Sequence, residues 1–207
     1  MVFVSAKSLG IPLSSLLEHP AAIDSNKDLM ARLEQVRQRA CSLAPNLRLS
    51  PPSPKLCVVH PRCQYSTTGG HTISEDSMDL LIRTVSTGVS HLAVSMQLQG
   101  IDTHLSTQQL HRTIPATTLA ALAVSTVFSD SVVAENIVHP LPCDASLKAT
   151  QDNVRAITVG QPAGCSTAMI KVKHGLPVST LMTRTARLIM DGSIPVDSEI
   201  QVHSSFD

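Results

Sequence analysis

Hydrophobic and polar positions along the first fifth of the chain predict a strand and then a helix. The stretch 2–10 opens on an apolar run and ends at Gly10, which is typical of a short strand followed by a turn. Capping side chains stand at 24–26, ahead of a segment with helical periodicity. One face of that segment carries four apolar residues, namely Leu29, Leu33, Val36 and Ala40. We therefore expect a helix that ends near residue 40, before a proline-rich loop.

The pattern in the middle of the chain is less regular. The compact apolar run at 55–60 predicts a strand that Pro61 stops. The polar stretch 62–77 contains two adjacent glycines and is interpreted as an exposed loop. The run at 79–85 predicts a helix, whereas 86–110 shows no clear period.

The second half begins with an almost wholly apolar segment, 115–128, which predicts a buried central helix. A strand is expected at 131–138, followed by three alternating strands at 154–159, 168–172 and 178–183, and a short helix at 185–190. Glycine- and proline-containing turns join the three strands into hairpins. Mixed helices and strands with terminal hairpins predict an α+β fold.

Composition narrows the class of protein. The chain has 207 residues, 43% of them hydrophobic, with 16 basic and 16 acidic residues. The chain therefore lacks the basic excess that nucleic-acid and membrane-surface binders need, and we expect it to bind neither nucleic acid nor a membrane. One tyrosine, three phenylalanines and no tryptophan argue against ligands held by aromatic stacking.

Cysteine usage and hydropathy bear on the compartment. Five irregularly spaced cysteines argue against a disulfide framework and favour a reducing compartment. The N-terminus lacks a signal-peptide core, and no apolar stretch is long enough to cross a bilayer. We therefore expect a cytoplasmic protein.

Two segments are candidates for binding a carboxylate. The first is Gly160–Gly164, where Gly160, Gln161 and Gly164 can bring backbone N–H groups close to an anion. The alternative is an ordinary hairpin turn. The second is His111–Thr118, where Arg112, Thr117 and Thr118 gather at the start of the predicted buried helix. The alternative there is a capped helix with a solvated arginine.

A zinc site is a weaker candidate. Thiol and imidazole groups occur at Cys57, His60, Cys63 and His71. Their spacing differs from that of zinc ribbons, and the first two lie on opposite faces of a predicted strand. We interpret them as core cysteines and loop histidines, and we expect no metal site. No nucleophile motif occurs, so catalytic residues stay unassigned.

Several segments together resemble the PrpF family of 2-methylaconitate, methylitaconate and aconitate isomerases. The resembling segments follow the family's order: 2–10, 28–40, 54–59, 111–118, 160–164 and 184–192. The last, Arg-Thr-Ala-Arg-Leu-Ile-Met-Asp-Gly, is the most specific. The resemblance covers nearly the whole chain, except for a poorly matching stretch at about 62–108.

The resemblance implies a lobe like those of diaminopimelate epimerase, a mixed strand barrel around a buried central helix. It also implies an isomerase that moves a proton and a double bond in a small unsaturated polycarboxylate, without a metal or organic cofactor. Such chemistry needs a base, an acid and donors that hold the carboxylates.

The resemblance also implies what is missing. Residues 1–207 match a single C-terminal lobe, and the lysine and cysteine proposed to move the proton belong to the family's N-terminal lobe, which we expect to be absent. The possible partners are a separate N-terminal-lobe chain or a second copy of this chain. A truncated, non-catalytic lobe that serves as a binding protein is the alternative function.

Overall fold

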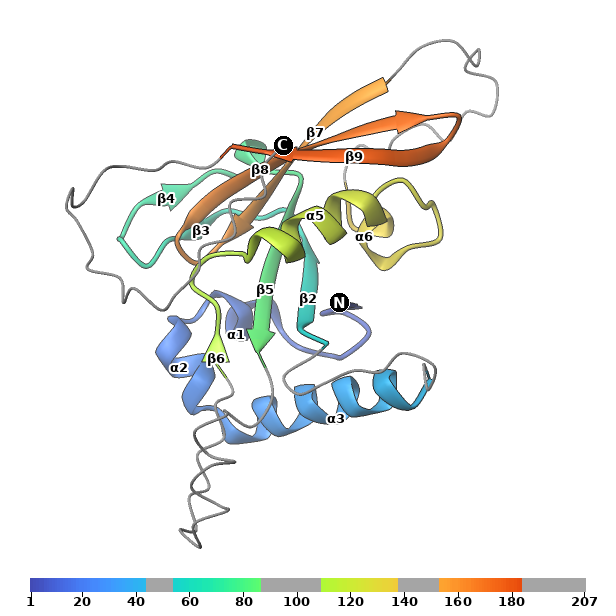
Figure 1. Cartoon of the computed structure of the whole chain (residues 1–207). Helices are drawn as coiled ribbons and strands as arrows, with labels where there is room; N and C mark the ends of the chain where they lie inside the picture. The colour runs from blue at the N-terminus through green and yellow to red at the C-terminus, as the bar shows by residue number, and fades with distance from the viewer. Residues whose placement is uncertain (44–53, 87–108, 138–152, 184–207) are drawn as a thin grey trace, which may run out of the picture.

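A mixed seven-stranded sheet forms the centre of the fold (Figure 1). The computed structural model describes residues 1–43, 54–86, 109–137 and 153–183. The strands are β1 (Val2–Ser5), β2 (Leu56–Pro61), β5 (Leu80–Ser86), β6 (Gln109–Leu110), β7 (Asn153–Gln161), β8 (Gly164–Lys173) and β9 (Leu176–Met182). Their order is β1-β2-β5-β7-β8-β9, with β6 paired to β5. The α+β class predicted from the sequence is confirmed.

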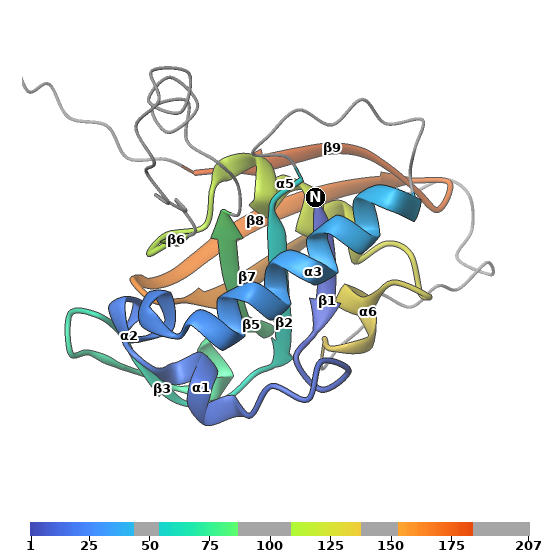
Figure 2. The same ribbon diagram turned by 90° about the horizontal axis from the view of Figure 1, so that it is seen from below.

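The first helical layer covers one face of the sheet. β1 and β2 are parallel, so the chain must cross over between them. It does so through α1 (Leu13–Leu17), α2 (Pro20–Ser25) and α3 (Lys27–Leu43), and α3 crosses beneath β1, β2 and β5 (Figure 2). A cluster of buried residues joins the two layers: Ile23, Met30 and Leu33 from the helices, and Leu56, Val58 and Val85 from the sheet.

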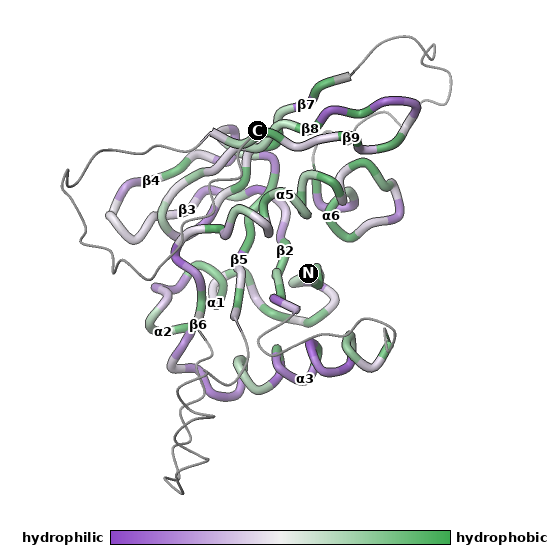
Figure 3. The backbone as a smooth tube through the Cα atoms, viewed as in Figure 1, coloured by the Kyte–Doolittle hydropathy of each residue, from purple (hydrophilic) through white to green (hydrophobic). Residues whose placement is uncertain are grey.

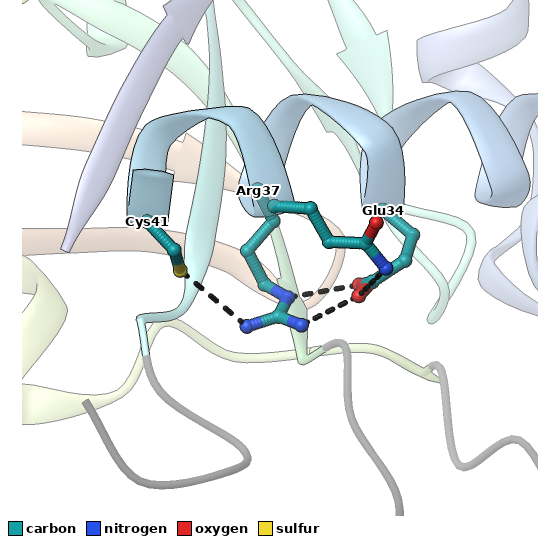
Figure 4. A network of polar contacts seen from close by, with 4 residues as sticks. Glu34, Arg37 and Cys41 are labelled. Carbon is teal, nitrogen blue, oxygen red and sulfur yellow. Dashed lines mark hydrogen bonds and ion pairs between the residues drawn. The ribbon is translucent and has the colours of Figure 1, made fainter. Parts of the chain in front are cut away.

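The predicted helix over 28–40 is confirmed as α3. It begins after Asn26, whose side-chain oxygen accepts a hydrogen bond of 3.0 Å from the Leu29 N–H. Figure 3 shows the alternation of hydrophobic and hydrophilic residues along it. Near its end, Arg37 donates to both carboxylate oxygens of Glu34, at 2.9 and 2.5 Å, and contacts the Cys41 sulfur at 3.8 Å (Figure 4). The hydrogen bond to Glu34 raises the pKa of Arg37.

The second helical layer lies on the opposite face, around which the sheet curls as a half-barrel. It consists of α5 (Ala116–Ser125) and α6 (Val132–Glu135). The predicted helix at 115–128 is therefore present, but α5 is fully buried on one side only, at Thr118, Leu119, Leu122 and Ala123. The side chains of Leu119, Leu122 and Ala123 meet a cluster drawn from four strands: Cys57, Val59, Leu80, Ile82, Ile157, Val159, Ala168 and Ile170.

Three predictions for the middle of the chain are wrong. The run at 79–85 is not a helix but strand β5, six of whose seven residues are buried. A short apolar run that is buried on both faces has no periodicity that distinguishes a strand from a helix. The expected strand at 131–138 contains α6, because the Ser131 hydroxyl caps a helical turn by accepting from the Ala134 N–H at 3.0 Å. The expected loop at 62–77 holds a small hairpin, β3 (Tyr65–Ser66) and β4 (Thr72–Ile73), and a 3-10 turn at Glu75–Ser77.

The hairpins predicted near the end of the chain are confirmed as β7, β8 and β9. Strands predicted at 2–10 and 55–60 are also present, as β1 and β2. The helix predicted at 185–190 and most of the unassigned stretch 86–110 lie outside the described residues. α1 and α2 were not predicted.

Candidate functional site

The segment Gly160–Gly164 forms a tighter turn than its sequence indicates. Gly160 and Gln161 are the last residues of β7, Gly164 opens β8, and Gln161 pairs with Gly164. Only Pro162 and Ala163 lie between the strands. Gly164 has a φ of +138°, which side chains rarely adopt, so a glycine is needed there.

Gly160 is required for another reason, which is close packing. A Cβ atom at this position would collide with the Met78 sulfur and lie 3.1 Å from Tyr65 Cε1 and 3.2 Å from Leu81 Cδ1. The absence of a side chain at Gly160 thus lets the Tyr65 ring lie against the end of β7.

The Tyr65 hydroxyl bridges the two sides of the turn. Its oxygen lies 2.7 Å from the Gln161 carbonyl oxygen and 2.6 Å from that of Gly164, and it accepts from the Gln161 N–H at 3.0 Å. The turn is tied to the same hairpin a second time, since the Thr68 N–H donates to the Pro162 carbonyl at 2.8 Å.

The two candidate segments come together in space. The Ala163 N–H donates to the Arg112 carbonyl at 3.0 Å, and the Ile114 N–H donates to the side-chain oxygen of Gln161. Gln161 is 5% exposed, and its side-chain nitrogen donates to the Ser166 hydroxyl at 2.9 Å. The turn therefore lies against the segment that leads into α5.

The amino end of α5 has unused hydrogen-bonding capacity. Pro115 is its N-cap, and no side chain of the described ranges caps the helix. Arg112 and Thr117 are exposed, whereas Thr118, in the first turn, is 0% exposed and its hydroxyl has no hydrogen-bond partner among the described residues. An uncapped helix start with a partial positive charge, a nearby arginine and free hydroxyls is a place that can hold a carboxylate.

A cavity of about 430 Å³ adjoins this arrangement on the β8 side. Its lining includes Leu119 of α5 and Ser166, the hydroxyl partner of Gln161. Another cavity, of about 330 Å³, lies at the start of α3, where it is lined by Asn26 and Arg32 among others. Only the first lies beside residues of the candidate site.

The residues considered for zinc do not gather. Cys57 is buried beside the Thr84 hydroxyl at 3.6 Å, and burial raises the pKa of its thiol to about 12. The His60 ring contacts the Pro61 carbonyl at 2.7 Å instead. Within the described ranges, no group of three or more metal-ligating side chains occurs. Nor does any helix described here have the length and hydropathy to cross a membrane.

Sequence reasoning missed Tyr65, which contributes most to holding the turn. It lies in the polar stretch interpreted as a loop, and its partner Gln161 is 96 residues away. The available signal was composition: Tyr65 is the one tyrosine of the chain, and an isolated aromatic in a polar stretch is a candidate for burial.

Comparison with known proteins relates the first half of the chain to one family. The model of the family described as PrpF protein matches residues 1–101, which include most of the stretch that resembles the family poorly by motif. The resemblance to the PrpF family is thereby confirmed.

Two individual proteins extend the likeness over the chain. The 3-methylitaconate isomerase of Eubacterium barkeri is 28% identical over 204 residues, which are 95% of this chain and 45% of that protein. The crystal structure of methylitaconate-delta-isomerase superposes with a TM-score of 0.62 at 26% identity, covering 92% of this chain and 42% of that one. The chain thus spans less than half the length of these two proteins, and its curled α+β fold is similar to that of the methylitaconate-delta-isomerase structure.

Proposed function

We propose that the chain contributes to a PrpF-like isomerase, which moves a proton and a double bond within a small unsaturated polycarboxylate of the aconitate, methylaconitate or methylitaconate type. The observation that carries the proposal is the start of α5, beside the Gly160–Gly164 turn: no described side chain caps it, and the Thr118 hydroxyl has no hydrogen-bond partner in the described part of the chain. Similarity to 3-methylitaconate isomerase along 95% of the chain supports the substrate class.

The reaction sets the roles of the residues. Removal of a proton from the carbon next to a carboxylate places negative charge on that carboxylate, and the proton returns to the other end of the allylic system as the double bond shifts. Arg112, Thr117, Thr118 and the first N–H groups of α5 are the donors that would stabilise this charge. Gly160, Gln161 and Gly164 would form the adjoining wall.

The remaining features of the proposal follow from the resemblance. The half-barrel and α5 would form one diaminopimelate epimerase-like lobe, with α5 as its central helix, in a cytoplasmic protein without a cofactor. An N-terminal lobe would supply the proton-transferring lysine and cysteine and close the cleft. A second copy of this chain would close the cleft but would bring no N-terminal-lobe residues.

Proton exchange provides the direct test. The chain is incubated in D₂O with cis-aconitate, trans-aconitate or methylitaconate, alone and with a candidate N-terminal-lobe chain, and substrate protons are followed by NMR. We expect deuterium incorporation or isomerisation of one substrate, lost on Thr118→Val and retained by a control, Ser42→Ala, on the far end of α3. Absence of exchange with all three substrates in both conditions would contradict the proposal.

The alternative is a non-catalytic lobe that binds another protein. It is favoured by the apolar side chains exposed on β7–β9: Val154 at 61%, Leu176 at 62%, Val178 at 58% and Leu181 at 60%. Light scattering tests this alternative, since a stable monomer that forms no complex with an N-terminal-lobe chain would contradict it.

A further inference from the structure

The contacts of Gln161 indicate how it serves the candidate site. Its main-chain N–H and carbonyl both contact the Tyr65 hydroxyl, its side-chain oxygen accepts from the Ile114 N–H, and its side-chain nitrogen donates to Ser166. All four polar groups are used within the protein. The side-chain nitrogen has a second N–H, but Gln161 is 5% exposed, so a ligand has little access to that donor.

Tyr65 is held in place from both ends. Tyr65 is 4% exposed, and its ring packs against Gly160. The Arg83 guanidinium lies 5.6 Å from the centroid of the ring. Burial raises the pKa of its phenol to about 12, so the hydroxyl keeps its proton at neutral pH. A protonated phenol can donate to one of the two carbonyls at the turn while it accepts from the Gln161 N–H.

The two residues form a connected path from the β3–β4 hairpin to α5. Tyr65 fixes the ends of the turn, and Gln161 joins the turn to Ile114, the residue before the N-cap Pro115. The Ala163–Arg112 backbone bond of 3.0 Å runs beside this link. A shift of the turn would therefore also shift the residues that begin the helix.

We propose that Tyr65 and Gln161 are positioning residues, which hold the Gly160–Gly164 turn and the Arg112–Thr118 segment in one fixed arrangement without contacting the bound carboxylate. This inference rests on the proposed function for the identity of the ligand. It assigns Gln161 a role different from the direct ligand contact expected from the sequence.

The test compares Tyr65→Phe with Thr67→Val in the full chain. Tyr65→Phe keeps the ring and its packing but removes the hydroxyl that bridges the turn. Thr67→Val removes a hydrogen bond from the same hairpin, the 3.1 Å bond from the His71 N–H to the Thr67 hydroxyl, which does not reach the turn. Binding of trans-aconitate is measured by calorimetry, and amide hydrogen exchange is measured by NMR.

We expect Tyr65→Phe to weaken trans-aconitate binding by about tenfold, as the loss of one well-placed hydrogen bond does, and Thr67→Val to leave it within about twofold. Exchange should accelerate at Gln161, which loses its partner, and also at Ile114, whose N–H does not touch Tyr65. The second change is the readout that a purely local defect would not produce.

Two results would overturn the inference: unchanged affinity in Tyr65→Phe, or faster exchange at Gln161 with Ile114 unchanged. If the wild-type chain binds no trans-aconitate, the proposed function fails for this chain on its own. The exchange of Ile114 in Tyr65→Phe still decides whether the turn and the helix start are coupled.

Discussion

The end of β7 is packed so closely that a single added methyl group is expected to destabilise the fold. Gly160 is buried, and a Cβ atom there would collide with the Met78 sulfur while lying 3.1 Å from Tyr65 and 3.2 Å from Leu81. The φ of Gly160 is not positive, so backbone strain does not contribute. In the folded state, Gly160→Ala therefore changes packing without adding backbone strain.

Two opposing effects set how much Gly160→Ala changes the free energy of unfolding. Overpacking of a buried site costs about 1–3 kcal/mol. Alanine also restricts the unfolded chain, which returns about 0.4–1 kcal/mol. We expect a net loss of about 1–2 kcal/mol in the free energy of unfolding, since Met78 is flexible but Tyr65 and Leu81 leave it little room. At about 2–4 °C per kcal/mol for a chain of this size, Tm should fall by several degrees.

Urea denaturation followed by circular dichroism measures this loss, with Gly69→Ala as the matched control. Gly69 also has no positive φ, and a Cβ there would meet its nearest neighbour, the His71 ring, at an ordinary 3.5 Å. We expect this control to stay within about 0.5 kcal/mol of the wild type.

A double mutant identifies the colliding side chain. Met78→Ala alone should cost about 2–5 kcal/mol because Met78 is 3% exposed. Combined with Gly160→Ala it should cost less than the sum of the two, by about 1 kcal/mol or more. Wild-type stability in Gly160→Ala, or strict additivity in the double mutant, would refute the packing explanation.

Three further predictions concern single groups. The phenolate absorbance of Tyr65 should appear only near pH 12, because the folded protein raises its pKa from 10.0 to about 12. The contribution of this pKa shift to the stability of the fold is complete below pH 10 and is lost as the pH rises through about 12. A titration midpoint near 10 would contradict this, and Tyr65→Phe should remove that part of the pH dependence of stability. Asn26→Ala should destabilise α3 by about 1 kcal/mol through loss of its N-cap, whereas Asn26→Asp should retain most of the stability in thermal melts. Cys57 should resist thiol reagents until the protein unfolds, because it is buried and burial raises its pKa to about 12. The exposed Cys165 should react in the native state. Peptide mapping by mass spectrometry after brief labelling measures both reactions.

The sequence predicts those elements best whose periodicity is strong and local. The helix at 28–40 and the hairpin strands at 154–159 and 168–172 are confirmed because their patterns match one geometry. The run at 79–85 fails because β5 is covered on both faces, by α3 and by α5, which erases the alternation that distinguishes a strand.

The candidate site was predictable in its parts but not in its assembly. The glycines of the turn and the residues before α5 carry local signals of turns and helix starts. The bonds that unite them do not, since Tyr65 and Gln161 are 96 residues apart and Ile114 and Gln161 are 47 apart. The expectation that Gln161 contacts a ligand stays a prediction, and its hydrogen bonds within the protein favour a positioning role instead.

The parallel pairing of β5 with β7 is the shortest ladder between long strands of the sheet. Only Leu80–Val159 and Leu81–Gly160 are paired, and Asp79 and Thr158 add two hydrogen bonds of 2.8 Å across a separation of 79 residues. The ladders β2–β5, β7–β8 and β8–β9 close much shorter loops, so they should form early during folding. The β5–β7 ladder, which is the seam between the two halves of the sheet, should form late. Hydrogen exchange should then show the two halves of the sheet opening along the seam before either half opens internally.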